Sequence, residues 1–310
     1  MIALLLFIFT FVEYNVENLF DTMHDQGKLD EEFLPNSSYH WTRYRYWRKL
    51  DHISQALVSC SDTTLGHLPD MAVLTEVEND TVMRDLTRRS PLRNARYEYV
   101  MTNSPDQRGI DVALLYSPFA FRLLNNHAVR INPPVGHRPT RDILYASGII
   151  MSGDTLHVIA VHAPSRAGGE AQSQPYRMIV AKKVIDIVDS INQNSQHPLI
   201  IVAGDFNDYS KDATLQLIVN HNMTEASLNA KGLNGARGTY RYHGEWGSLD
   251  HIFCNDRLVE KFKFCHIYDA PFLLEEDKKY GGVKPHRTFL GPRYLGGFSD
   301  HLPLVAVFAF

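Results

Sequence analysis

The chain alternates short, almost wholly apolar runs with polar segments, and most of these runs have the length of a strand. An apolar run of five to eight residues rich in β-branched side chains is typical of a strand buried on both faces. We predict such strands at 7–14, 70–76, 110–116, 143–151, 156–161, 199–203 and 304–310. Further strands are expected at 97–101, 121–124, 128–131 and 248–253.

Helical spacing is less frequent than strand patterning. Tyr46, Leu50, Ile53 and Leu57 recur on one face of a predicted helix, with Thr42 as its N-cap. The longest helix is expected at about 174–194, and shorter ones at 213–219 and from Asn79 or Asp80 to Leu86. Many apolar strands with few long helices favour two packed sheets covered by helices over a doubly wound single sheet.

Composition limits the classes of protein without choosing one. At 310 residues, 44 % apolar and 21 % charged, the chain can bury a large core, and it contains no evident linker or repeat. We therefore expect one domain over residues 1–310. A net charge of −4 argues weakly against tight duplex binding, which usually needs a strongly basic face, but leaves room for a nuclease with a local basic patch.

The three cysteines and the first residues are the ambiguous features. Cys60, Cys254 and Cys265 show no metal-ligand spacing, so buried thiols are expected; a Cys254–Cys265 contact between neighbouring strands is the alternative for an exported protein. Residues 2–12 are apolar like a signal-peptide core, without a preceding Lys or Arg or a small-residue cleavage site. Two interpretations stay open. Residues 1–6 are the remnant of an export signal and the protein is exported, or the protein is cytoplasmic. The run is too short for a transmembrane helix.

Polar side chains follow many of the predicted strands. Asp205 and Asn207 come directly after the 199–203 run, two positions apart, so in extended backbone they would point to one side; an Asx turn is the alternative. The other strand ends carry Asn15 and Glu17, Glu76, His162, Asp250, and Asp300 with His301. Each has an ordinary structural explanation alone, but converging strand ends are where α/β enzymes build sites.

These residue types suit metal-assisted phosphate chemistry. Oxygen ligands without cysteine favour Mg²⁺, Mn²⁺ or Ca²⁺ over zinc. A histidine held in one tautomer by an aspartate serves as acid or base near neutral pH. Asparagine amides and a metal both stabilise charge on phosphoryl oxygens.

The motifs together resemble those of the endonuclease/exonuclease/phosphatase superfamily, the DNase I-like fold. They are Asn-Val-Glu-Asn-Leu-Phe (15–20), Thr-Glu-Val-Glu-Asn (75–79), Val-His-Ala-Pro-Ser (161–165), Gly-Asp-Phe-Asn-Asp (204–208), Ser-Leu-Asp-His-Ile-Phe (248–253) and Ser-Asp-His-Leu-Pro (299–303). They span nearly the whole chain in the family's order. The resemblance implies an α/β four-layered α/β/β/α sandwich of two mixed sheets flanked by helices, with a metal-dependent phosphoester hydrolase site.

The resemblance also implies roles for these positions. Glu76 would be the principal metal ligand, with Asn15 orienting metal or phosphate and Asp300 beside the metal or nucleophile. Asp205 would activate water, Asn207 would bind the scissile phosphate, and His301, oriented by Asp250, would contact the phosphate and transfer a proton. Glu17 takes a neighbouring position whose role varies.

One departure from the apurinic-endonuclease branch is informative. His162 stands where that branch has a Tyr-Val-Pro-Asn-like motif, and is similar instead to DNase I, sphingomyelinases and inositol-phosphate phosphatases, so it would share acid and base duties with His301. Arg108 matches a phosphate-contacting position of the DNase I branch, or else closes a loop. Ser165, Arg166, Arg241, His286 and Arg287 are weaker candidates for substrate contacts.

We therefore expect a divalent-metal phosphodiesterase, nuclease or phosphatase that attacks by in-line displacement of the phosphoester. The modest charge slightly favours a phosphatase for small or lipid phosphates, or a weak nuclease. A non-catalytic binding module with this fold is the alternative from another class; it predicts gaps in the motif set, and there are none. We expect a monomer without a protein partner.

Overall fold

The computed structural model describes residues 7–61, 66–133, 136–166 and 169–310. The suggested export-signal remnant at residues 1–6 lies outside them. Within the described residues, no helix has the length and apolar character needed to cross a membrane.

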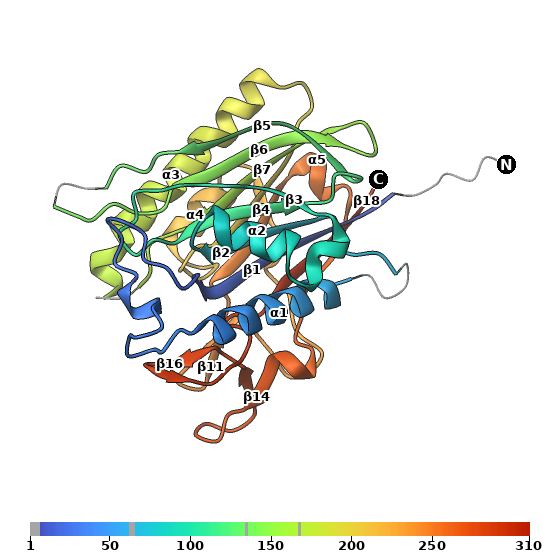
Figure 1. Cartoon of the computed structure of the whole chain (residues 1–310). Helices are drawn as coiled ribbons and strands as arrows, with labels where there is room; N and C mark the ends of the chain where they lie inside the picture. The colour runs from blue at the N-terminus through green and yellow to red at the C-terminus, as the bar shows by residue number, and fades with distance from the viewer. Residues whose placement is uncertain (1–6, 62–65, 134–135, 167–168) are drawn as a thin grey trace.

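Two six-stranded mixed sheets form the centre of the molecule (Figure 1). The first has the order β13-β18-β1-β2-β4-β3 and the second the order β5-β6-β7-β8-β12-β9. The first comprises β1 (Ile8–Leu19), β2 (Met71–Val77), β3 (Glu98–Met101), β4 (Asp111–Tyr116), β13 (Phe262–Ile267) and β18 (Leu304–Ala309). The second comprises β5 (Phe121–Val129), β6 (Ile143–Ile150), β7 (Thr155–His162), β8 (Leu199–Asp205), β9 (Met223–Glu225) and β12 (Asp250–Asn255).

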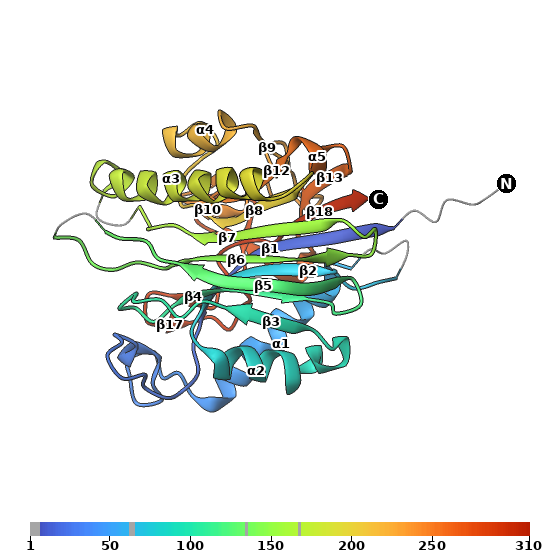
Figure 2. The ribbon, with the colours of Figure 1, turned by 90° about the horizontal axis from the view of Figure 1, so that it is seen from above.

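Helices cover the outer faces of both sheets, and Figure 2 shows the resulting four layers. On the first sheet lie α1 (Arg43–Ser59) and α2 (Asp80–Arg88). On the second lie α3 (Glu170–Asn194) and α4 (Ala213–Val219), while α5 (Asp256–Val259) follows β12. Short 3-10 turns complete the helices at Glu31–Phe33, Pro91–Ala95 and Pro271–Leu273. The α/β/β/α sandwich expected from the sequence is confirmed.

Three small hairpins lie outside the sheets. They are β10 (Tyr240–Tyr242) with β11 (Glu245–Gly247), β14 (Leu274–Glu276) with β15 (Val283–Pro285), and β16 (Phe289–Leu290) with β17 (Arg293–Tyr294). The last two fall in a stretch rich in glycine, proline and charge, where no apolar alternation marks a strand.

The helix signals read from the sequence are found where expected. The Thr42 side chain accepts a hydrogen bond from the Arg45 amide, and the Asn79 side chain accepts one from Val82. The face of α1 that carries Tyr46 and Leu50 is buried. Because each cap satisfies an amide that the helix leaves unpaired, these residues fix the helix starts.

One expectation is wrong in detail. The segments 121–124 and 128–131 are not separate strands: β5 runs through Phe121–Val129 against β6, with a register shift between Leu123 and Asn125 that accommodates the polar middle.

The cysteines are free thiols, as expected. Cys60 and Cys254 are buried, and Cys265 is partly exposed. Cys254 and Cys265 lie on strands of different sheets, β12 and β13, and not on neighbouring strands as the alternative required.

Candidate active site

The candidate residues meet at one end of the sandwich because two parallel strand pairs end there. β1 runs parallel to β2, and β7 runs parallel to β8, so each pair brings two carboxyl ends to one sheet edge. In the second pair His162 lies in register with Asp205. Asp250 begins the antiparallel neighbour β12, again opposite Asp205.

Asn15 and Asp205 connect the two sheets across the site. The Asn15 amide donates to Asp205 Oδ2 over 3.0 Å, and both residues are buried. His162 Nε2 lies 3.8 Å from the same carboxylate oxygen, while its Nδ1 has no hydrogen-bond partner among the described residues. Asp205 is therefore contacted from both halves of the molecule.

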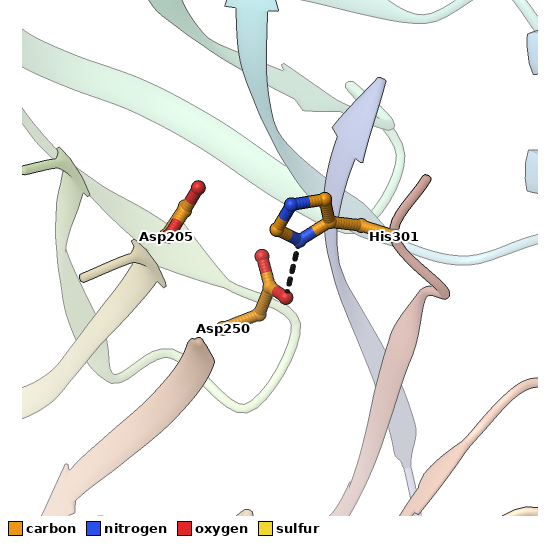
Figure 3. Close-up of side chains that lie close together, drawn as sticks. All are labelled: Asp205, Asp250 and His301. Carbon is orange, nitrogen blue, oxygen red and sulfur yellow. Dashed lines mark hydrogen bonds and ion pairs between the residues drawn. The ribbon is translucent and has the colours of Figure 1, made fainter. Parts of the chain in front are cut away.

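Asp250 and His301 form a buried pair beside Asp205 (Figure 3). His301 Nδ1 and Asp250 Oδ2 are 2.7 Å apart, and Thr239 Oγ1 donates to the same oxygen. Ser299 Oγ accepts from the His301 amide and donates to the Asn15 carbonyl, which fixes the loop before β18. Since Nδ1 faces the carboxylate, the ring is held in one orientation with Nε2 available to a substrate.

Asn207 does not continue the strand as expected from extended backbone. β8 ends at Asp205, and Asn207 has a φ of +51° while its amide donates to Asp205 Oδ1 over 2.8 Å. This is the Asx turn that the sequence left open. The Asn207 side chain donates to the Ala163 carbonyl over 3.1 Å, so it remains beside His162 at the site.

Glu76 lies at a bulge in β2, where the register with both neighbouring strands shifts and its φ is +64°. Its carboxylate accepts from the Asn18 amide at 2.9 Å and from both Arg108 nitrogens at 3.1 and 3.3 Å. Glu17 and Asn18 also have positive φ values of 48° and 54°. Non-glycine residues in this region cost about 1–3 kcal/mol each and cluster at functional sites.

A second group of charged side chains, around Arg287 and Glu17, lies next to the Glu76–Arg108 pair. Arg287 Nη2 donates to Asp300 Oδ2 over 3.0 Å and to Glu17 Oε1 over 3.3 Å. Glu17 also accepts from the amides of Thr288 and Phe289, and the buried Lys49 binds Thr288 Oγ1 at 2.6 Å. Glu17 thus holds the segment after β15 against β1.

The two histidines of the site have opposite pKa shifts. Burial lowers the pKa of His162 well below its usual value, and the charges of Arg141 and Arg108 lower it further. Burial opposes charge on His301 too, but Asp250, with Asp300 and Asp205, raises its pKa well above the usual value. The site therefore pairs a neutral imidazole with a charged one at neutral pH.

The carboxylates of the site also differ in the direction of their pKa shifts. Burial, reinforced by Asp250, raises the pKa of Asp205 to about 7. Burial raises that of Glu17 to about 7 as well, with Asp300 adding to it. For Glu76 burial acts in the same direction, but Arg108 and His301 outweigh it and lower the pKa. Of these three carboxylates, Glu76 is accordingly the one best suited to stay ionised.

Two sets of side chains fit a cation differently. Ligand atoms of Asp205, Asp250 and His301 lie within 4.8 Å of one another, the spacing of a metal site. However, the charged His301 ring and its hydrogen bond to Asp250 make this set better suited to proton transfer. Glu76, Asp300 and Asn15 offer hard oxygen atoms, of which Glu76 is ionised and Asp300 is partly exposed, so this set suits Mg²⁺.

A cavity of about 750 Å³ opens beside the metal-type ligands. Cations and aromatic rings both line it, including Arg108, Arg141, Arg287, Tyr39, Phe289 and Tyr176. A cavity of this size and polarity is able to accept an anionic group of a substrate.

The weaker sequence candidates differ in where the structure places them. Arg287 is at the site and Ser165 lines the cavity. Arg166 is committed to Asp208, Asp212 and Glu170, and Arg241 to Asp277 and backbone carbonyls. His286 packs its ring against Phe298.

Sequence reasoning missed several residues that complete the site. They are Lys49, Arg141, Thr239 and Tyr240, of which Arg141 donates to the Ala163 carbonyl over 2.9 Å. Lys49 and Arg141 come from a helix and a loop far from the motifs. The structure reveals Lys49 and Arg141 through their burial, and no periodicity in the sequence predicts that these two side chains are buried.

The sequence matches the model of the endonuclease/exonuclease/phosphatase family over residues 10–309. A search of the curated proteins finds no match.

Solved structures of low identity share the fold. A Bacteroides thetaiotaomicron protein described by the same family name is 15 % identical with a TM-score of 0.63, and the alignment covers 98 % of each chain. The mannosyl-6-phosphatase Bt3783 of that organism is 14 % identical with a TM-score of 0.64, covering 97 % of this chain and 100 % of that one. The human Nocturnin catalytic domain is 17 % identical with a TM-score of 0.59, covering 97 % and 94 %.

Proposed function

The chain belongs to the endonuclease/exonuclease/phosphatase family, and on that premise we propose that it hydrolyses phosphoester bonds with a divalent metal ion. Members of the family are typically phosphoester hydrolases, and the named solved relatives include a phosphatase. We also propose that the chain acts as one domain, since the family match extends over residues 10–309.

The observation that carries the proposal is the buried group of Asp205, Asp250 and His301. A binding module gains nothing from two carboxylates and an imidazole kept within 4.8 Å in the protein interior, because burying such groups is costly. Positioned carboxylates and an imidazole are the groups that general acid–base catalysis at a phosphoester uses.

Each side chain then has a role set by its contacts. Asp205, fixed by Asn15 and the Asn207 amide, accepts a proton from the attacking water. His301, kept charged by Asp250, hydrogen-bonds a phosphoryl oxygen through Nε2 and supplies a proton to the leaving oxygen. The neutral His162 orients the water or the phosphate beside Asp205. Arg108 and Arg287 offset the negative charge of the phosphoryl group.

Glu76, Asp300 and Asn15 would hold the metal ion, which we propose to be Mg²⁺ or, in its place, Mn²⁺ or Ca²⁺. When bound, such an ion polarises the phosphoryl oxygen and lowers the pKa of a water ligand. Asn15 Oδ1 accepts the Glu17 amide and keeps a second lone pair for this purpose.

The test is hydrolysis of a substrate panel in the presence of Mg²⁺, Mn²⁺ or Ca²⁺, and of EDTA. The panel holds single-stranded and plasmid DNA, RNA, sphingomyelin, inositol phosphates, sugar phosphates and p-nitrophenyl mono- and diesters. We expect cleavage of at least one ester that EDTA abolishes. If no ester of the panel is hydrolysed and calorimetry detects no metal binding, the proposal is contradicted and a binding module is favoured.

A further inference from the structure

Aromatic rings lead outward from the catalytic His301 in a continuous series. The Tyr240 ring lies 4.9 Å from the His301 ring, and Tyr242 follows at 6.5 Å from Tyr240. His243 lies 4.1 Å from Tyr242, and Tyr280 lies 6.2 Å from His243. We call Tyr240, Tyr242, His243 and Tyr280 the aromatic ladder.

The rings of the ladder are nearly parallel. Successive interplanar angles along it are 14°, 11° and 25°, and Tyr242 and Tyr280 are 60 % and 45 % exposed. Large aromatic side chains left this exposed contribute little to the core, so their common orientation needs another explanation.

The ladder is fixed in place by its surroundings. Tyr240 forms a β-bridge with His301, and the Leu302 amide donates to the Thr239 carbonyl over 2.8 Å. Arg241 joins the two hairpins that carry the rings: it donates to the carbonyls of Gly244 (3.0 Å) and Gly281 (2.9 Å) and pairs with Asp277 at 3.5 Å. Gly244 allows the hairpin tips to touch, because a Cβ there would lie 2.8 Å from Tyr280 Cβ. A surface fixed in this way loses little conformational entropy when a ligand binds.

We propose that the aromatic ladder is a subsite that stacks the nucleobases of a single-stranded nucleic acid whose scissile phosphate lies at His301. This inference rests on the proposed function and names the substrate class of the same site. Base stacking on aromatic rings is tolerant of sequence and contributes much of the affinity of single-strand binding proteins.

Three features favour this occupant. Rings that recur outward from the catalytic group suit a polymer with one flat base for each phosphate. Lys279, whose Nζ lies 4.7 Å over the Tyr280 ring, places a cation at the outer end where a further phosphate would pass. The net charge of −4 disfavours a duplex, whose binding depends on many phosphate contacts, and affects stacked single strands less.

The first measurement is binding of a labelled short single-stranded DNA in EDTA, monitored by fluorescence anisotropy. In the Tyr242→Leu/Tyr280→Leu double variant we expect binding to weaken about tenfold or more, with recovery in the Phe counterparts, which keep the rings. The same DNA backbone carrying abasic sites should bind wild type about as weakly as the intact DNA binds the double variant.

Phe119→Leu is the matched control, because Phe119 is 74 % exposed and lies beyond β4, at the opposite end of that strand from the site. It should leave DNA binding unchanged. With Mg²⁺, Phe119→Leu should also hydrolyse bis(p-nitrophenyl) phosphate at the wild-type rate, because Phe119 contacts neither the site nor the ladder.

Equal binding of DNA by wild type and the double variant would overturn the inference, as would equal binding of abasic and intact DNA. Ladder-dependent binding of an oligosaccharide phosphate in preference to DNA would also overturn it. Ladder-dependent DNA binding by a protein that cleaves none of the panel and binds no metal in calorimetry would instead support the subsite and contradict the proposed hydrolase.

Discussion

His162 and His301 are both buried beside Asp205, yet their surroundings favour opposite protonation states. His162 Nδ1 has no partner among the described residues, and burial together with the charges of Arg141 and Arg108 lowers the pKa of the ring, whereas His301 Nδ1 faces a carboxylate at 2.7 Å. Two similar side chains therefore have opposite pKa shifts, and the proposed roles of the two histidines follow from this difference.

Replacing His301 with Ala should lower kcat about 10²- to 10⁴-fold, the usual contribution of one acid–base residue. The reason is the loss of the charged imidazole held by Asp250. The measurement is steady-state kinetics on whichever ester the panel identifies, with circular dichroism to show that the fold is kept. Near-normal turnover in a folded variant would exclude His301 from the mechanism.

The polar residues of the site were largely predictable from the sequence because they sit at strand ends, where a short apolar run followed by Asp, Asn or His is visible. Their backbone geometry was not. The left-handed turn at Asn207 and the bulge at Glu76 depend on hydrogen bonds to Asp205 and Asn18, which come from tertiary contacts. Lys49 and Arg141 were missed for the same reason.

The backbone of β8 at Gly204, just before the site, leaves no room for a side chain beside β7. Gly204 has a φ of +145°, and a Cβ added there would lie 1.8 Å from the Val161 carbonyl oxygen. Only glycine permits the parallel pairing that places His162 opposite Asp205.

Gly204→Ala should destabilise the protein by at least about 2–3 kcal/mol, since backbone strain and steric overlap add together. Urea denaturation measures this. Gly153→Ala is the control, because Gly153 also has a positive φ of 90° but an added methyl group there would meet no atom within 4 Å, so it should cost only about 1 kcal/mol. Equal losses would show that the contact with Val161 is unimportant.

The segment after β2 contains a buried carboxyl among acidic neighbours. Burial raises the pKa of Glu78 to about 9, with Asp21 and Asp25 adding to it, while the Asp21 amide donates to Glu78 Oε2 over 2.7 Å. Because the folded state retains the proton and the unfolded state loses it, the contribution of Glu78 to stability is full below about pH 4.5 and declines as pH rises toward 9.

In the Glu78→Gln variant the side chain cannot ionise, so the stability of the variant should not decline in this way as pH rises. We expect the variant and wild type to be similar near pH 4, and the variant to be more stable near pH 8 by at least about 1.4 kcal/mol, the equivalent of one pKa unit. Denaturant titrations at both pH values check this. A difference that is the same at both would contradict the assignment.

Element type was predicted better than element boundaries. Long apolar strands and the capped helices α1 and α2 were found because local signals and tertiary packing agree in them. β5 was split into two strands because polar residues interrupt its apolar alternation at Asn125 and Asn126. The short strands β9 to β11 and the strands β13 to β17 were not predicted, because they too lack a clear apolar alternation.

The two sheets meet at the candidate active site and not only through the apolar core between them. Asn15 of one sheet donates to Asp205 of the other, and Glu76 and Asp300 come from the first sheet and the loop before β18. A ligand that binds these residues therefore stabilises the folded chain as a whole by mass action.

Mg²⁺ should raise the Tm of wild type by a few degrees when present well above its Kd, which corresponds to about 2.7 kcal/mol at a hundredfold excess. Glu76→Gln, which keeps the side-chain volume but removes the charge, should lose most of this rise. Differential scanning calorimetry at matched ionic strength with NaCl is the measurement. The same rise in both proteins would exclude Glu76 as a ligand.

The fold class could be read from the sequence because apolar runs reveal strands and their number favours two sheets. The arrangement of the hairpins β10–β11 and β14–β15 could not, because it depends on Arg241 joining segments about forty residues apart. The aromatic ladder exists only in that arrangement.

The left-handed residues Asn18, Glu76 and Asn207 have a consequence for laboratory evolution. Glycine at any of them would relieve backbone strain, so selection for heat resistance alone should enrich glycine there. The enriched variants would lose the side chains that line the site. A library screened for thermal survival and one screened for turnover should therefore diverge at these three codons first, and their divergence would map the site without any knowledge of its substrate.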